Sequence, residues 1–126
     1  MDTVVTVVQG LLGFLLTMGA LAKLAFPYAR YTNMPAVGWS KEFKPGQLRL
    51  IGVLELMGGL GLLVPLLLPS LAPFTPLAAV GIALYMAGAM AIHLRRSEYP
   101  HMVGNLLFFL APALLIAYGW LIGFAV

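Results

Sequence analysis

A glutamate lies well inside one of the most apolar stretches of this 126-residue chain. It is Glu55, within RLIGVLELMGGLGLLVP, which runs from Arg49 to Pro65. An ionised carboxylate that faces lipid is costly, so Glu55 is expected to face the inside of a helix bundle beside a cation. Ionisable groups within membrane spans usually serve a function, so Glu55 is the first candidate for chemistry.

Two basic side chains are expected near the depth of Glu55. At about 1.5 Å per helical residue, Lys23 lies about one turn inside the end of the first apolar run, and His93 lies less than a turn inside the third. Lys23 or His93 could donate a hydrogen bond to a carbonyl oxygen while Glu55 relays a proton, so these three are the candidate catalytic residues. Structural alternatives stay open: an ion pair for Glu55, a Lys23 side chain that reaches the interface, and a boundary position for His93.

Four more residues are candidates for ligand binding. Asn105 lies about one turn inside the fourth apolar run. Tyr85 lies two turns deeper than the histidine on nearly the same side of its helix, where it either lines a cavity or packs. Arg49 is about 120° around an ideal helix from the glutamate. Its side chain is therefore expected at the rim of the site or in contact with a lipid headgroup phosphate. Trp39, in the first loop, is the fourth.

The composition argues against several other kinds of site. The chain has no cysteine, which excludes disulfides, thiolate catalysis, iron–sulfur clusters and cysteine-ligated zinc. Apart from cysteine, the plausible metal ligands are Glu55, His93, Glu98 and His101. They form no metal-binding motif at helical spacing, so no metal site is expected. A single axial haem ligand at His93 is compatible with the sequence, but no feature favours it. Without a basic tail, no nucleic-acid partner is expected.

The candidate residues lie in a chain with the composition of a membrane protein. Hydrophobic residues make up 62% and charged residues 9%, against about 45–50% and about 25% in globular proteins. Four apolar runs are each long enough to cross a bilayer, which takes about 20 residues; they cover about 4–26, 47–68, 74–94 and 102–126. The sequence therefore predicts one all-α transmembrane domain over residues 1–126, a four-helix bundle that runs up-down-up-down in the lipid bilayer.

Prolines and a long first loop shape this bundle. Pro27 ends the first run because it lacks an N–H, and Pro112 should kink the fourth. No basic segment precedes the first run, which favours a retained helix over a secretory signal peptide. The loop at about 27–46 is long for a helix connection. Its aromatic side chains act either as an interfacial anchor or as a lid over a cavity; they are Tyr28, Tyr31, Trp39 and Phe43.

The positive charges predict the orientation. All seven flank or occupy the first and third loops: Lys23, Arg30, Lys41, Lys44, Arg49, Arg95 and Arg96. Because cytoplasmic loops carry an excess of Lys and Arg, loops one and three are expected in the cytoplasm and both termini outside.

Repeated patterns raise two further expectations. GFLLTMGALAKL, from Gly13, is similar to GIALYMAGAMAIHL, from Gly81, which indicates two repeated helical hairpins. Gly119 and Gly123 have GxxxG spacing, so a homo-oligomer and packing within one chain are both open.

Three stretches of the chain resemble the DoxX and DoxX-like family of small integral membrane proteins with four helices. They are GALAKL, FKPGQLRLIGVLELMGGLGLLVP and MAIHLRR, which carry Lys23, Arg49, Glu55 and His93. The resemblance implies that these four residues form an inner polar site. The family's namesake accompanies a thiosulfate:quinone oxidoreductase, other members are linked to oxidative-stress complexes, and a distant animal relative assists receptor assembly. We therefore expect a bacterial inner (plasma) membrane protein, with a larger membrane or redox protein among the candidate partners.

The leading functional hypothesis is binding of a lipophilic, carbonyl-bearing molecule such as a quinone between the helices. The chain would act as a small enzyme or as a membrane subunit of an oxidoreductase system, and the sequence does not decide whether it is an enzyme. The second hypothesis is an assembly or scaffolding factor for another membrane protein. A transporter is a third, weaker option, because four short helices leave little room for a path.

Overall fold

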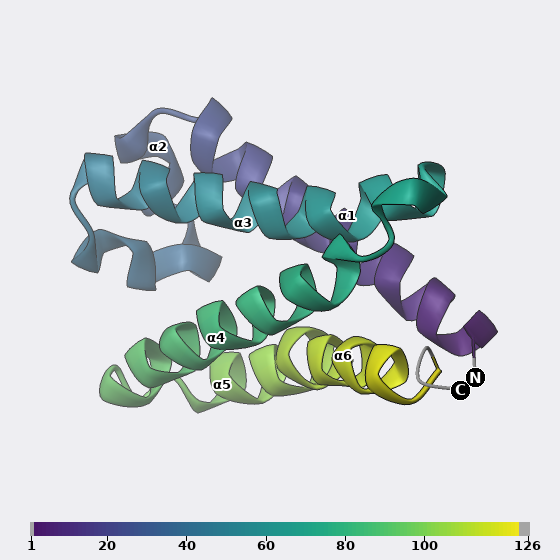
Figure 1. Ribbon diagram of the computed structural model, residues 1–126. Helices are drawn as coiled ribbons and strands as arrows, with labels where there is room; N and C mark the ends of the chain where they lie inside the picture. The colour runs from purple at the N-terminus through teal and green to yellow at the C-terminus, as the bar shows by residue number, and fades with distance from the viewer. Residues whose placement is uncertain (1, 124–126) are drawn as a thin grey trace.

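The computed structural model describes residues 2–123, which form long helices joined by short helical connections (Figure 1). Four segments are long and apolar enough to cross a membrane, with mean hydropathies of 1.9 to 2.1 in this part of the chain. They are α1 (Asp2–Ala25), α3 (Pro45–Leu67), α4 (Phe74–Arg95), and a fourth made of α5 (Tyr99–Asn105), the π-helical turn η3 (Leu106–Leu110) and α6 (Ala111–Gly123). The predicted four-helix membrane bundle is confirmed.

The helix bounds follow the apolar runs closely. The expected spans at 4–26, 47–68 and 74–94 agree with α1, α3 and α4 to within two residues at either end. The fourth begins at Tyr99, earlier than expected, because α5 starts directly after the turn, and residues 124–126 lie outside the described residues. At the start of α3, the side-chain Oε1 of Gln47 accepts a hydrogen bond from the backbone N–H of Lys44.

The connections are unequal in size. The first contains α2 (Tyr28–Thr32) and η1 (Pro35–Glu42), and the second only η2 (Pro69–Leu71). Figure 1 shows α3 and α4 close together next to η2 and diverging toward their other ends, where η1 lies between them. The long first loop is therefore folded into the bundle at the end where α3 and α4 separate.

Small residues bring α1 and α3 close together. A Cβ on Gly59 would lie 2.9 Å from the backbone nitrogen of Thr17, and one on Gly13 would lie 2.8 Å from Cγ of Leu63. Neither distance leaves room for a side chain. The two helices can pack this closely only because both positions are glycine.

The apolar core is narrow, and most large apolar side chains point outward. The buried cluster consists of Leu12, Leu16, Leu62, Ala79, Ile82, Met86, Ala113 and Ile116. Exposed Leu, Val, Phe and Met side chains cover the outside of all four spans. A water-soluble fold would bury such residues, whereas lipid solvates them, so this distribution suits a bilayer.

Pro112 in the fourth span is accommodated by the π-helical turn that precedes it. The backbone N–H of Ala111 donates to the carbonyl of Leu106, five residues back. Such a turn shifts the hydrogen-bond register where proline supplies no donor. The helix therefore continues through η3 into α6.

Gly119 of the GxxxG pair packs inside the monomer. A Cβ at this position would lie 2.9 Å from Cγ2 of Val5, so the glycine lets α6 approach α1. The surroundings of Gly123 lie outside the described residues. Gly119 therefore packs against α1 of the same chain. The homo-oligomer stays a prediction.

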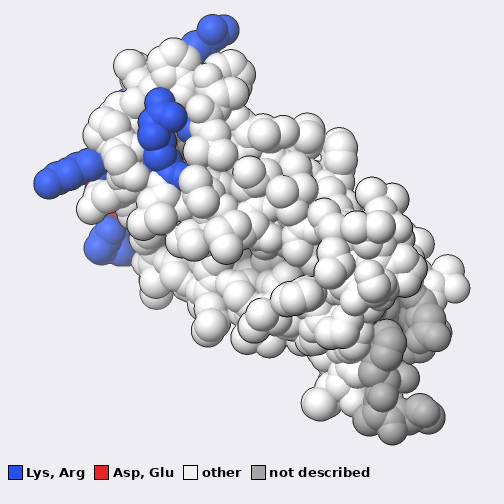
Figure 2. Space-filling model, turned by 45° about the horizontal axis from the view of Figure 1, so that its top comes forward, with Lys and Arg blue, Asp and Glu red and all other residues white. Residues whose placement is uncertain are grey.

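The positive charges gather at one end of the molecule. Figure 2 shows the visible Lys and Arg side chains at that end and an almost uncharged surface elsewhere. This is the end where α1 and α4 finish and α3 begins, with Lys23 and Arg95 in the last turns of their helices. We call it the cationic end.

Candidate functional site

A cavity of about 320 Å³ lies between the spans at the cationic end. Side chains from all four spans and from the first loop line it. The polar and aromatic ones are Lys23, Tyr31, Trp39, Phe43, Glu55, Tyr85, His93, His101, Asn105 and Phe109. The remaining lining is aliphatic, so a few polar groups converge in an apolar space, as in many small-molecule sites.

An ion pair between α1 and α3 forms one wall of the cavity. Nζ of Lys23 lies 2.6 Å from Oε1 of Glu55, and each side chain is only 7% exposed. The expected inward-facing glutamate with Lys23 as its partner is what the structure contains. A buried carboxylate is tolerated here because an ammonium neutralises it and donates a hydrogen bond.

Two glycines make space for this ion pair. A Cβ on Gly19 would lie 2.9 Å from Oε2 of Glu55, and one on Gly52 would lie 3.1 Å from Cβ of Lys23. Gly52, Glu55 and Gly59 follow one another at helical spacing on the buried face of α3. The glycines therefore hold the helices close enough for the two charged groups to meet.

The first loop covers the ion pair with aromatic rings. Nζ of Lys23 lies 5.5 Å from the ring centroid of Trp39 and 5.8 Å from that of Tyr31, both within cation–π range. Trp39 also packs edge-on against Phe43 and His93. The ammonium thus has an anion on one side and aromatic faces on the other.

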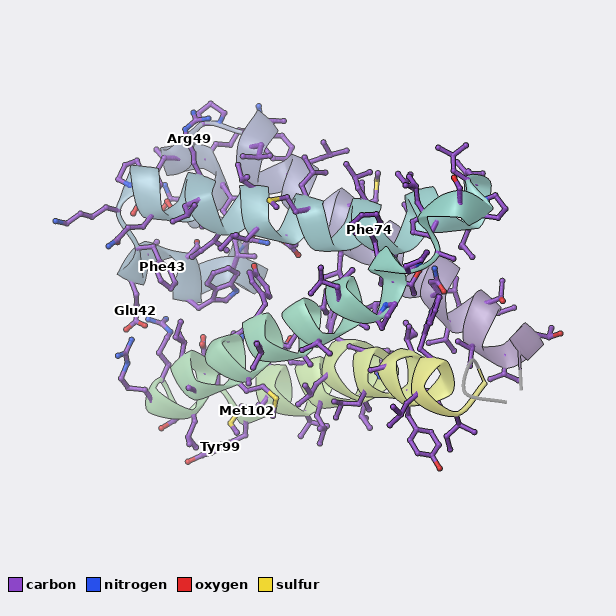
Figure 3. The ribbon with its side chains drawn as sticks, viewed as in Figure 1. Glu42, Phe43, Arg49, Phe74, Tyr99 and Met102 are labelled. Carbon is purple, nitrogen blue, oxygen red and sulfur yellow. The ribbon has the colours of Figure 1, made fainter. Side chains whose placement is uncertain are left out.

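Polar contacts hold this loop in place. Tyr28 donates from its hydroxyl to the carbonyl of Phe43, and Ser40 donates to the carbonyl of Val37. Glu42 reaches from η1 to α4, where Nη2 of Arg95 donates a hydrogen bond of 2.9 Å to Oε2 of Glu42 (Figure 3). The loop therefore lies as a lid over the cavity, which is one of the two readings that its sequence left open.

Tyr31, in the α2 part of this lid, has a buried side chain that keeps its proton. Burial raises the pKa of the Tyr31 phenol above its ordinary value, and the neighbouring Lys23 ammonium offsets part of the effect. The phenol is therefore available as a hydrogen-bond donor next to the ion pair.

The opposite wall carries His93 from α4 and His101 from α5. Nδ1 of His93 lies 3.0 Å from Oε1 of Glu98, and the two imidazole rings stack with centroids 5.0 Å apart. The hydrogen bond from His93 holds the pKa of the Glu98 carboxyl below its usual value, and Arg96 acts in the same direction. His93 is buried, whereas His101 is exposed at the mouth of the cavity.

Most of the residues that the sequence singled out meet in this cavity. Six of the seven line it: Lys23, Trp39, Glu55, Tyr85, His93 and Asn105. Arg49 does not line it; it is exposed on the side of α3 that faces away from α4 (Figure 3). Arg49 is therefore not brought into the candidate ligand-binding site, because it lies around the helix from Glu55.

Two polar residues of the lining, Tyr31 and His101, were not among the candidate site residues. Tyr31 appeared only among the loop aromatics, because nothing local marks which ring folds inward. His101 and Glu98 lie in EYPH, which already places an acid and a histidine three residues apart. That spacing, read across the turn toward His93, is the signal that could have identified this part of the site.

A second hollow, of about 600 Å³, lies between α3 and α4 and is almost entirely apolar. Its lining includes Met57, Phe74 and Leu77, together with Gly58, Gly61 and Gly81. Only Gly81 of these glycines has no heavy atom within 4 Å of a Cβ position. Glu55 and Tyr85 line both this groove and the cavity. The groove therefore lies next to the polar cavity, with Glu55 and Tyr85 at the boundary between them.

Comparison with known proteins gives one match. A family model described as the DoxX-like family matches residues 7–117, which include every lining residue of the cavity. No curated protein and no solved structure matches the chain.

Proposed function

The chain belongs to the DoxX-like family of integral membrane proteins, and from this premise we propose that it binds a lipophilic, carbonyl-bearing small molecule such as a quinone. The ligand would occupy the cavity between the four spans. In this role the protein acts as a small enzyme or as a membrane subunit of an oxidoreductase system.

The observation that carries the proposal is a buried, hydrogen-bonded ion pair at the wall of a largely apolar cavity. The cavity volume of about 320 Å³ lies within the usual range for small-molecule sites, about 300–1,000 Å³. Lys23 has further N–H donors beyond the one given to Glu55, and a carbonyl oxygen is the complementary acceptor. A flat ring would also pack against the aromatic side chains of Trp39 and Phe43.

Proton transfer is the chemistry that these groups support. Reduction of a quinone carbonyl needs a proton at its oxygen, and Lys23 and Tyr31 are both donors at the cavity wall. Glu55, 2.6 Å from the ammonium and ionised in this pair, would take up a proton from water at the cationic end and pass it to the neutral Lys23 amine. The electrons would come from a partner or a second substrate.

The apolar groove supports a ligand with a long hydrocarbon tail. Because Glu55 and Tyr85 line both hollows, a polar ring in the cavity and a tail between α3 and α4 would form one continuous binding mode. The groove lies on the lipid-facing side, so the ligand would enter from the bilayer without crossing water.

We also propose the orientation in the membrane. The cationic end would face the cytoplasm of a bacterial inner membrane, since cytoplasmic loops carry the excess of Lys and Arg. The head of the ligand would then lie in the cytoplasmic half of the bilayer, near soluble redox partners.

Trp39 offers a direct test of ligand binding, because bound quinones quench tryptophan fluorescence. In a Trp120→Phe background, Trp39 is the remaining tryptophan. Titration with a short-chain quinone analogue should quench it at saturable concentrations. Lys23→Met and Glu55→Gln should each weaken binding about tenfold or more, the value of a hydrogen bond to a charged group.

Arg49→Gln is the matched control, because it removes a cation of the same end that does not line the cavity. Its affinity should equal that of the parent. Equal affinities in all three variants would reject the proposal. Co-purification of a larger membrane protein, whose yield falls when this chain is deleted, would instead favour the assembly role.

A further inference from the structure

The turn between α4 and α5 brings together three side chains of metal-ligand type. In the described part of the chain, His93, Glu98 and His101 form a group whose ligand atoms all lie within 4.8 Å of one another. They come from the end of α4, the turn and the first part of α5. The cluster lies at the mouth of the cavity, because both histidines line it.

A tight reversal of the chain builds this cluster. Ser97 has a φ of 57°, a left-handed conformation that few non-glycine residues adopt. The backbone N–H of Glu98 then donates to the carbonyl of His93 at 2.8 Å, which folds the turn back over the end of α4. α5 begins immediately afterwards and points His101 back toward His93.

The distances in the cluster are close to those of a metal centre. Zinc lies about 2.0–2.2 Å from nitrogen and oxygen ligands, which separates neighbouring ligand atoms by about 3.3 Å. Nδ1 of His93 and Oε1 of Glu98 are already 3.0 Å apart. The imidazole centroids, 5.0 Å apart at 26°, suit two rings bound to one ion. His101 is exposed, and its ligand nitrogen lies within 4.8 Å of the other two ligand atoms.

We propose that His93, Glu98 and His101 bind a divalent transition-metal ion, with zinc as the best fit to two imidazoles and one carboxylate. Three protein ligands leave at least one coordination position for water or for a ligand oxygen in the cavity. The proposal goes beyond quinone binding and does not depend on it.

Neighbouring side chains would orient the ligands. Nε of Arg96 donates to Oε1 of Glu98 at 3.0 Å, and the edge of Trp39 packs against the ring of His93. Such outer contacts fix the direction of metal ligands. Two arginines nearby oppose a cation, but Glu42 contacts both Arg95 and Arg96 and offsets their charge.

The experiment uses the full chain in detergent, with any purification tag removed, and titrates it with Co²⁺ and then Zn²⁺. One equivalent of Co²⁺ should give visible ligand-field bands of the strength expected for four or five ligands, and Zn²⁺ should displace it. His101→Asn and Glu98→Gln should each lose about tenfold or more in affinity. Both positions lie outside the buried core, so the variants should fold, and helical content by circular dichroism checks this.

Glu42→Gln separates local charge from direct ligation, since it removes a carboxylate that lies outside the cluster but pairs with Arg95 and Arg96. Its affinity for Co²⁺ should fall less than that of His101→Asn or Glu98→Gln, and an equal or larger fall would count against direct ligation. Weak, unsaturable binding, or equal binding by the parent, His101→Asn and Glu98→Gln, would overturn the proposal. Quinone binding that persists in His101→Asn would leave the function proposed above intact, so the two proposals can fail separately.

Discussion

Nζ of Lys23 and Oε1 of Glu55 lie 2.6 Å apart and join α1 to α3, 32 residues away in the chain, where each side chain is 7% exposed. This ion pair connects the stability of the bundle to the proposed binding site. Replacing one partner leaves the other as an uncompensated charge inside the membrane. Replacing both residues with apolar ones leaves no unpaired charge inside the membrane.

We therefore predict strong coupling in a double-mutant cycle. Lys23→Met and Glu55→Met should each lower the free energy of unfolding by about 3–5 kcal/mol, and the double variant should lose much less than their sum. Denaturant titration in detergent, followed by circular dichroism, measures the four corners. Additive losses would show that the two groups do not stabilise each other.

The space around the carboxylate depends on Gly19. In Gly19→Ala the new Cβ would lie 2.9 Å from Oε2 of Glu55, so the carboxylate must turn away from Lys23. Affinity for the quinone analogue, measured by Trp39 fluorescence, should fall about tenfold, the value of one hydrogen bond to a charged group.

Gly10→Ala on the same helix controls for helix propensity, because the nearest atom to its new Cβ is 3.7 Å away. Alanine should stabilise either helix position by about 0.8–1 kcal/mol. Gly10→Ala should therefore bind like the parent. If Gly19→Ala did so too, the carboxylate would not be constrained as described.

The groove between α3 and α4 predicts a dependence on tail length. Gly81 lines the groove and has no heavy atom within 4 Å of a Cβ position, so a leucine there should extend into the groove. Gly81→Leu should bind a short-chain quinone like the parent but lose the extra affinity that a long tail provides, roughly 0.8 kcal/mol per buried CH₂ group.

Gly88→Leu is the matched control, two turns further along α4, equally free of close neighbours and outside the groove. It should keep the full tail-length dependence. If Gly81→Leu bound long-tailed and short-tailed quinones with the affinities of the parent, the tail would not lie in this groove.

The absence of cysteine permits a clean test of orientation. Lys41→Cys lies in the first loop and Ser70→Cys in η2, both at exposed positions. With a membrane-impermeant maleimide on intact cells, Ser70→Cys should be labelled at once, and Lys41→Cys only after permeabilisation. The reverse pattern would invert the proposed orientation.

The sequence by itself determined the spans, the clustering of cations and the inward direction of Glu55. The spans follow from hydropathy, which depends only on the order of residues along the chain. The direction of Glu55 follows from the high free energy of a carboxylate in lipid, which requires a cation beside it. The sequence did not determine the place of Arg49, which was a candidate for ligand binding but does not line the cavity.

The tertiary structure decided which distant groups meet. Tyr31 and Trp39 face Lys23 because the first loop folds between α3 and α4, and His101 meets His93 because the chain reverses at Ser97. The contacts of Lys23 with Tyr31 and Trp39 depend on how the first loop packs against the spans, and side-chain periodicity carries no information about that packing. The contact of His101 with His93 is close in sequence, but it depends on the backbone conformation at Ser97.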